Sequence, residues 1–458
     1  MRATPQFWVL AVFLSLVFVF GGASRIDVPS LVVVLPLSAA VCAYALMTIR
    51  REHFMPFRTP VLVLAAVMTL CILHLIPLPP ALWHSLGGRE LFVEIDKAAG
   101  LSGQWRPLTI SPFNGWHALL SLLAPLGILL LGIQLPREER FHLLAVVTGL
   151  AIVSGFLGIL QVIGSPRGPL YFYRITNNGS AVGLFANRNH AAVLLACLFP
   201  MIATFASLGG ATKPVERLRK ILAVGVVIVN LPLLLVTGSR AGFAIGLLGL
   251  VAAAVLYHSA PSNSGSSKAA KWYKVGQLPL LIGAAIFAVG LLTAIFSRAE
   301  VIGRLFGGQA GQDTRGEFWA VSMQVIRDYF PWGSGVGSFV EAYEIREPVS
   351  TLGPQYVNHA HNDWIEIVLT MGLPGFLLLL VGLAAVVRRS WFIWIQGDGR
   401  MREVRIARLA SVVMAMLALA SITDYPLRTP ALSSFFALCV LWLFSGESSR
   451  IAVSGKGA

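Results

Sequence analysis

Three residues that can bind an anion or accept a proton stand at the ends of long apolar segments. Arg188 lies in Gly183-Leu-Phe-Ala-Asn-Arg-Asn-His190, Arg240 in Thr237-Gly-Ser-Arg-Ala-Gly242, and His361 in Asn358-His-Ala-His-Asn-Asp363. The planar arginine fork binds phosphate oxygens, and histidine accepts a proton near neutral pH. Two arginines and a histidine suit a transfer reaction with a diphosphate leaving group. The arginines hold the anion, and the histidine accepts a proton from an attacking hydroxyl.

Each of these residues also has a structural interpretation. An arginine at the end of a membrane helix commonly anchors the helix by reaching the polar headgroups. His359, His361 and Asp363 alternate along the chain, so an extended segment would place them on one face as metal ligands. The sequence shows no fourth ligand beside them, and we expect neither a metal nor a cofactor. The residue types alone therefore indicate a polar site at a membrane boundary.

Membrane-spanning helices must position these residues. The chain has 458 residues, of which 56% are hydrophobic and only 12% are charged. A helix needs about 20 apolar residues to span a bilayer, whereas soluble proteins carry about 25% charged residues. We therefore predict an all-α integral membrane protein with about twelve spans, near residues 6–22, 28–48, 60–76, 114–135, 141–163, 186–208, 221–237, 241–257, 277–296, 364–387, 405–422 and 431–445.

The distribution of basic residues predicts the orientation. If the N-terminus is cytoplasmic, alternate loops, both termini and the flanking helix ends share its side. They carry 21 of the 35 Lys and Arg but only 7 of the 21 Asp and Glu, so the whole net charge of +14 lies there. Short cytoplasmic loops favour basic residues. The pattern predicts a multi-pass protein of the bacterial inner membrane with both termini cytoplasmic, including a short tail at 446–458. The positive net charge is therefore explained by membrane orientation, and no nucleic-acid partner is expected.

Two loops on the opposite side are long, at about 77–113 and 297–362. Loops longer than about 15 residues are commonly functional or disordered. The second loop contains helix-like stretches and aromatic residues, so we expect it to be ordered. Since this loop contains His361 and follows the predicted ninth span, we expect it on the side that Arg188, Arg240 and His361 share.

The motifs resemble those of a known family. His361-Asn362, nine further residues and Gly372-Leu-Pro-Gly375 resemble the signature of the O-antigen ligase and polymerase family: His, then Asn, Ser or Gln, nine residues, Gly, two residues, Gly. Trp332-Gly-Ser-Gly-Val-Gly-Ser-Phe339 resembles the glycine-rich segment of the family's large periplasmic loop. The segments around Arg188 and Arg240 resemble its two arginine-bearing segments. The resemblance covers about 150 to 440, so we divide the chain into four spans and the start of a fifth at 1–150 and a ligase-like domain at 151–445.

The resemblance implies a metal-independent, inverting glycosyltransferase with a multi-span fold of the C type. Such enzymes use glycans carried on undecaprenyl diphosphate. By position, Arg188 and Arg240 would bind the diphosphate, and His361 would be the catalytic base or would position the acceptor. Three other residues resemble further family positions: Arg315, Asn362 and Asp424.

Several functions are compatible with these motifs. The family includes ligases that transfer a glycan to lipid A–core, polymerases that extend a glycan repeat by repeat, and enzymes that transfer glycans to protein. We predict the ligase reaction on a lipid A–core sugar, with polymerisation of a growing glycan as the alternative. A polysaccharide or lipid transporter would show two similar halves and charges near the bilayer midplane. A non-catalytic assembly protein is a further alternative, and membrane lipids are expected partners in every case.

Overall fold

The computed structural model describes residues 3–208, 212–258, 315–349, 352–353 and 356–445. The predicted span at 277–296, the first part of the loop at 297–362 and the tail at 446–458 lie outside the described residues. Within the described part the chain is mostly helical, and its one sheet is an antiparallel pair of the two-residue strands β1 (Pro77–Leu78) and β2 (Arg106–Pro107).

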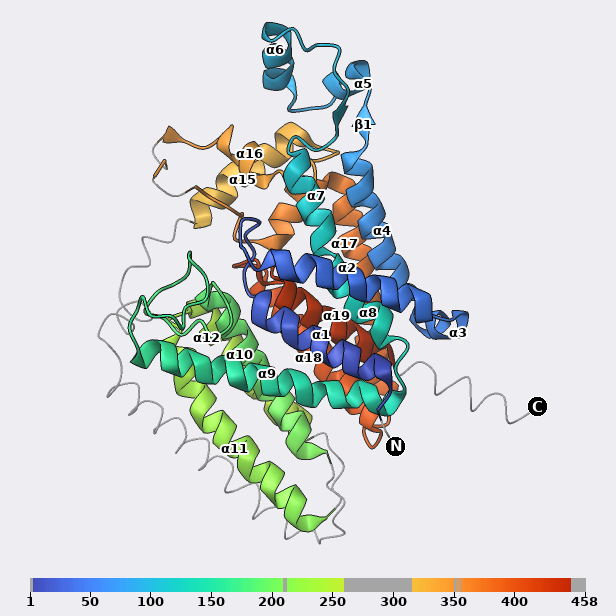
Figure 1. Cartoon of the computed structure of the whole chain (residues 1–458), viewed down its shortest axis with the longest axis vertical. Helices are drawn as coiled ribbons and strands as arrows, with labels where there is room; N and C mark the ends of the chain where they lie inside the picture. The colour runs from blue at the N-terminus through green and yellow to red at the C-terminus, as the bar shows by residue number, and fades with distance from the viewer. Residues whose placement is uncertain (1–2, 209–211, 259–314, 350–351, 354–355, 446–458) are drawn as a thin grey trace, which may run out of the picture.

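Each of the eleven predicted spans that fall on described residues corresponds to a helix or to two consecutive helices (Figure 1). They are α1 (Pro5–Phe20), α2 (Leu31–Thr48), α4 (Arg58–Leu75), α7 with α8 (Pro112–Ser121 and Leu123–Gly132), α9 (Arg137–Ile163), α10 (Arg188–Ser207), α11 (Lys213–Val236), α12 (Arg240–His258), α17 (Asp363–Gln396), α18 (Arg402–Ala420) and α19 (Pro430–Phe444). The shorter elements are α3 (Arg51–Phe54), η1 (Met55–Phe57), α5 (Pro80–His84), α6 (Glu90–Ala98), α15 (Arg315–Tyr329), α16 (Phe339–Glu344) and η4 (Pro426–Arg428).

Eight helical segments in the described residues are long and apolar enough to cross a membrane, and α1 and α19 are shorter apolar helices. The first two turns of α18 carry Arg402, Arg405 and Arg408, which lower its mean hydropathy. The prediction of an all-α membrane protein is confirmed at this level. The total of about twelve spans and the C-type arrangement stay predictions.

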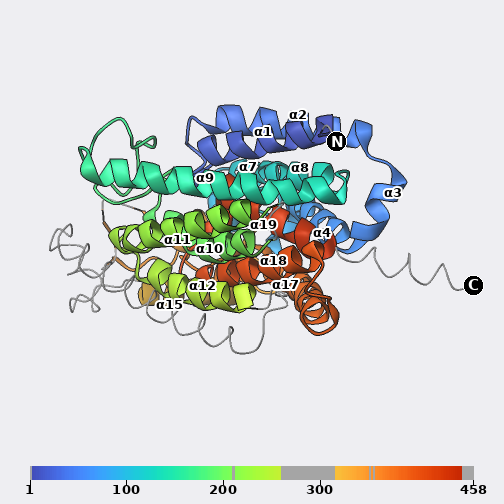
Figure 2. The same cartoon turned by 90° about the horizontal axis from the view of Figure 1, so that it is seen from below.

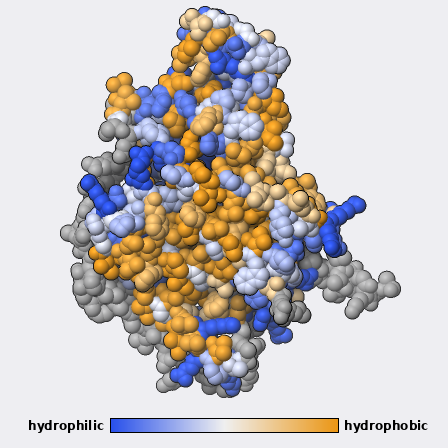
Figure 3. Space-filling view, in the orientation of Figure 1, coloured by the Kyte–Doolittle hydropathy of each residue, from blue (hydrophilic) through white to orange (hydrophobic). Residues whose placement is uncertain are grey.

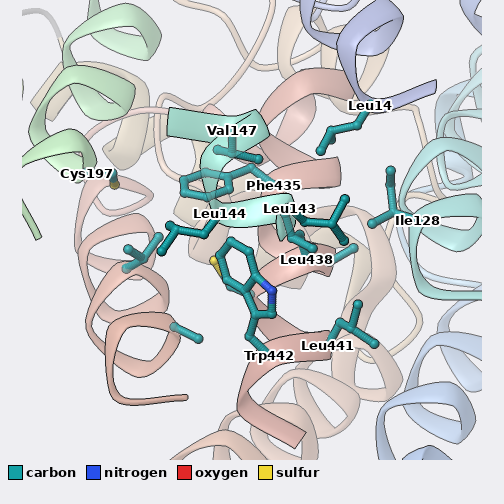
Figure 4. Packing of buried hydrophobic residues seen from close by; sticks show 14 of the residues in the cluster. Leu14, Ile128, Leu143, Leu144, Val147, Cys197, Phe435, Leu438, Leu441 and Trp442 are labelled. Atoms are coloured by element: carbon teal, nitrogen blue, oxygen red, sulfur yellow. The ribbon is translucent and has the colours of Figure 1, made fainter. Parts of the chain in front are cut away.

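The interior of the bundle is formed by α10 and α19, which the other helices surround (Figure 2). Phe435, Leu438 and Trp442 of α19 pack among leucine, isoleucine and valine side chains of α1, α8 and α9 (Figure 4). The Trp442 indole N–H donates to the Arg140 carbonyl at 2.8 Å, so this buried polar group is satisfied.

Apolar side chains cover the outer surface as well. Leu62, Val153 and Val381 are each more than half exposed on α4, α9 and α17. The space-filling view shows the resulting apolar surface over the helices (Figure 3). An interior and an exterior that are both apolar are expected of helices surrounded by lipid.

The two ends of the bundle are held by different polar contacts. At one end, the Ala186 amide donates to the Gly22 carbonyl at 3.1 Å, and the Asp363 amide donates to the Ser421 carbonyl at 2.9 Å. The first contact joins the α1–α2 and α9–α10 connections, and the second joins the α18–α19 connection to the start of α17. At the other end, Thr4 donates to the Glu139 carboxylate at 2.7 and 2.6 Å. The first end also carries His361, and we call it the site end.

The long connection between α4 and α7 packs against α15 above the site end (Figure 1). The Arg89 guanidinium lies 5.1 Å from the ring centroid of Trp83 and 5.1 Å from that of Tyr329, and Arg89 is only 1% exposed. The Ser111 hydroxyl donates to the Glu341 carboxylate of α16 at 2.6 Å. The residues around 77–113 therefore form a cap together with the described part of the loop at 297–362.

Candidate functional site

His361 lies immediately before α17 and is held by the start of that helix. Asn362 is the N-cap: its side-chain oxygen accepts from the Trp364 and Ile365 amides at 3.0 and 3.2 Å. The backbone of His361 has φ = 50°, which is uncommon for a residue with a side chain. The neighbouring Ala360 carbonyl accepts from the Trp319 indole of α15 at 3.0 Å. Asn362 therefore caps α17, and the contacts on either side place His361 between α15 and α17.

Asp424, in the turn between α18 and α19, is the carboxylate nearest to His361. The two side chains approach to 3.3 Å between Nδ1 and Oδ1, and Asp424 is 2% exposed. The same oxygen accepts from the Tyr425 amide at 3.0 Å, and Oδ2 accepts from the Asn189 side-chain amide at 2.5 Å. His190 Nε2 lies 3.9 Å from Oδ1. A single buried carboxylate thus joins the start of α10 to the His361 segment.

The surroundings of Asp424 keep it ionised. Burial alone raises the pKa of a carboxyl group, but the contacts with His361, His190 and Asn189 lower it more, so the pKa of Asp424 lies below its ordinary value. A carboxylate beside an imidazole orients the ring and stabilises its protonated form. This arrangement suits a histidine that takes up a proton during a reaction.

A second histidine–carboxylate pair lies beside the first. His359 Nδ1 is 2.9 Å from Glu366 Oε1, and Arg428 bonds to Asp363 at 3.0 Å and approaches Glu366 to 3.3 Å. The Tyr425 ring separates the two pairs, with centroid distances of 4.3 Å to His359 and 4.9 Å to His361. This pair was not predicted from the sequence, although two carboxylates in the first turn of an apolar helix are a signal for a polar contact.

His359, His361 and Asp363 do not face one another as the metal interpretation requires. Their nearest charged partners are Glu366, Asp424 and Arg428 respectively. In the described ranges no group of three or more His, Cys, Asp or Glu is arranged to hold a metal ion.

The two arginine segments come together at the site end. Arg188 and Arg240 are the first residues of α10 and α12, which run side by side in the same direction. A Cβ on Gly242 would lie 2.2 Å from the Ala192 Cβ. A Cβ on Gly238 would lie 3.8 Å from Arg188 Nη1, so the Arg188 guanidinium lies against the turn that precedes Arg240. Arg188 is half-buried and Arg240 is exposed.

Arg188 is also adjacent in the chain to the residue that bonds to Asp424. The Arg188 guanidinium thus lies against the turn before Arg240, and the next residue, Asn189, bonds to Asp424, which lies beside His361. Arg315 is the first residue of α15, and its side chain lies outside the described part of the structure.

The glycine-rich segment is inserted at a break in α17. Gly372 has φ = 59° and ψ = −154° and interrupts the helix. The Leu373 amide donates to the Pro331 carbonyl at 2.7 Å, and the Ser334 and Gly335 amides donate to the Leu369 and Thr370 carbonyls at 3.0 and 2.9 Å. The first glycine of the signature therefore serves as the docking point for the loop that covers the site.

The helix bundle and the polar cluster at its end define a multi-pass membrane protein with a histidine–carboxylate site beside two arginines. The family model described as O-Antigen ligase matches residues 225–380, which confirms the resemblance seen in the motifs. The match includes Arg240, the glycine-rich segment and His361, whereas Arg188 and Asp424 lie outside it. No curated protein matches the chain.

Proposed function

We propose that this protein is a glycosyltransferase that moves a glycan from undecaprenyl diphosphate to a hydroxyl group of lipid A–core on the periplasmic face of the inner membrane. The observation that carries the proposal is that Arg188, the turn before Arg240, Asn189, Asp424 and His361 lie together at one end of a bundle of which residues 225–380 match the O-antigen ligase family model. The family alone supports either a ligase or a polymerase. We propose the ligase reaction, with polymerisation of a growing glycan as the alternative.

In the proposed reaction, His361 accepts the proton of the acceptor hydroxyl while the hydroxyl oxygen forms a bond to the anomeric carbon. The bond between that carbon and the diphosphate oxygen breaks on the opposite side, and the leaving diphosphate keeps the electron pair. Arg188 and Arg240 hold this anion through paired N–H donors. Asp424 stabilises the protonated imidazole, and the configuration at the anomeric carbon is inverted.

The test is transfer in a reconstituted system that contains lipid-linked glycan, lipid A–core and equal amounts of folded protein. His361→Ala should lower turnover about 10²–10⁴-fold, as expected for the loss of a positioned base. Arg240→Lys should also reduce transfer, because lysine keeps the charge but offers a point contact in place of a planar fork. Since the residues act together, the double variant should be little worse than the poorer single variant.

Arg388→Ala is the matched control. Arg388 is exposed near the far end of α17, and its removal should leave transfer unchanged. Activity should also survive EDTA, because the arginines are proposed to neutralise the leaving group. Wild-type turnover by both His361→Ala and Arg240→Lys would refute the assignment and favour transport. Deletion of the gene separates the remaining alternatives, since loss of long lipopolysaccharide chains with an intact core indicates a ligase, and loss of polymer alone indicates a polymerase.

A further inference from the structure

Asn189 lies between Arg188 and the Asp424–His361 pair. It follows Arg188 directly in the first turn of α10, and its side chain donates to Asp424 Oδ2 at 2.5 Å across 235 positions of sequence. Asp424 Oδ1, the other oxygen of the same carboxylate, lies 3.3 Å from His361. The Asn189 amide therefore holds Asp424 Oδ2, while Asp424 Oδ1 faces His361, the proposed base.

The start of α10 does not need the Asn189 side chain. The Arg188 amide donates to Asn177 Oδ1 at 2.9 Å, and the Asn189 amide donates to Asn187 Oδ1 at 2.8 Å. Other asparagines thus cap the helix and satisfy its first N–H groups. Because an ionised carboxylate only accepts hydrogen bonds, the Asn189 side chain must present its NH₂ group to Asp424.

We propose that Asn189 is a positioning residue for the transfer reaction: it orients Asp424 and, through Asp424, the His361 imidazole. The proposal rests on the proposed function, since it assigns His361 the role of base. Without the Asn189 amide, Asp424 Oδ2 loses its hydrogen bond, and the carboxylate is held through Oδ1 by the Tyr425 amide and His361. The orientation of the carboxylate toward His361 is then less restricted. The loss should fall on turnover, whereas binding of the donor at Arg188 should be retained.

Two substitutions test this assignment in the reconstituted transfer assay. Asn189→Ala should lower kcat about ten- to a hundredfold, as for the loss of a hydrogen bond to a charged group, with the KM for the lipid-linked donor changed less than about twofold. Asn189→Asp should be worse near neutral pH, because two carboxylates then face each other. Its activity relative to wild type should rise as the pH falls toward about 5, since a proton shared between the carboxyl groups restores the donor.

Asn177→Ala is the matched control, because it removes a bond at the same helix start without touching Asp424. It should raise the KM for the donor and keep the wild-type dependence of kcat on pH. If Asn189→Ala yields little folded protein, the pH profile of Asn189→Asp within one preparation still provides the test. A wild-type kcat for Asn189→Ala, or a wild-type pH profile for Asn189→Asp, would overturn the positioning role while transfer by the wild-type protein stands. Absence of transfer by the wild-type protein itself would instead refute the proposed function, and the role of Asn189 with it.

Discussion

Replacement of Gly372 by alanine should detach the glycine-rich segment from α17. An added Cβ would lie 2.2 Å from the Pro331 carbonyl oxygen and 2.7 Å from the Gly333 nitrogen, and both are backbone atoms that cannot turn aside. The backbone at φ = 59° and ψ = −154° also belongs to a region that essentially only glycine adopts. The variant must therefore either displace the segment or change the path of α17.

The free-energy cost of Gly372→Ala follows from the backbone conformation at the break in α17. Backbone strain of this kind costs about 1–3 kcal/mol. The three hydrogen bonds from Leu373, Ser334 and Gly335 are broken on opening in both proteins, so they do not enter the difference. Strain of about 1–3 kcal/mol corresponds to about one to two powers of ten in the equilibrium for local opening.

Hydrogen exchange of the peptide that contains Ser334 and Gly335 measures this opening. Its amides should exchange about 10–100-fold faster in Gly372→Ala than in wild type, up to the limit set by global unfolding. Gly382→Ala on the same helix is the control. The nearest atom to its added Cβ is the Val63 Cγ1 at 3.7 Å, so exchange should be unchanged. Equal exchange rates in the two variants would refute the docking of this segment at the helix break.

Two further predictions concern the bonds that assemble the site. Asp424→Asn should lower the thermal stability of the protein. Because the pKa of Asp424 is below its ordinary value, the stabilisation from the ionised carboxylate is complete above about pH 4 and is lost only as the pH falls through the folded pKa. The difference in Tm between wild type and variant should therefore not shrink between pH 8 and pH 5, and a decrease over that range would contradict the shift. Gly242→Ala should raise the KM for the lipid-linked donor, because its Cβ would lie 2.2 Å from the Ala192 Cβ and would push α10 and α12 apart. Combining it with Ala192→Gly should restore part of the affinity, and a double variant no better than Gly242→Ala would contradict this cause.

The sequence predicts the helices well because long apolar runs give a strong local signal. It also places the Arg188, Arg240 and His361 segments at one end of the bundle, since loop alternation alone determines their side. It does not reveal the Asn189–Asp424 bond, whose partners are 235 positions apart. The contact depends on how α10 packs beside the turn between α18 and α19, and no local pattern reports that packing.

The packing of the cap could not be predicted from the sequence either. The two long loops could be identified by their length, but their mutual packing depends on single contacts such as Arg89 between Trp83 and Tyr329. Gly335 is another such contact, because a Cβ there would lie 2.0 Å from the Thr109 Cα. Both residues occur in segments without helical or strand periodicity. Their role becomes visible only when the distant chain segment that they contact is in place.

The break at Gly372 gives the spacing of the family signature a geometric meaning. The nine residues between Asn362 and Gly372 form about two and a half helical turns that join the cap of α17 to its break. One inserted residue would rotate the break by about 100° and advance it by about 1.5 Å. The Leu369 and Thr370 carbonyls would then point away from the Ser334 and Gly335 amides. The number of residues in this part of α17 therefore sets both the distance and the angle between His361 and the loop that docks at Gly372.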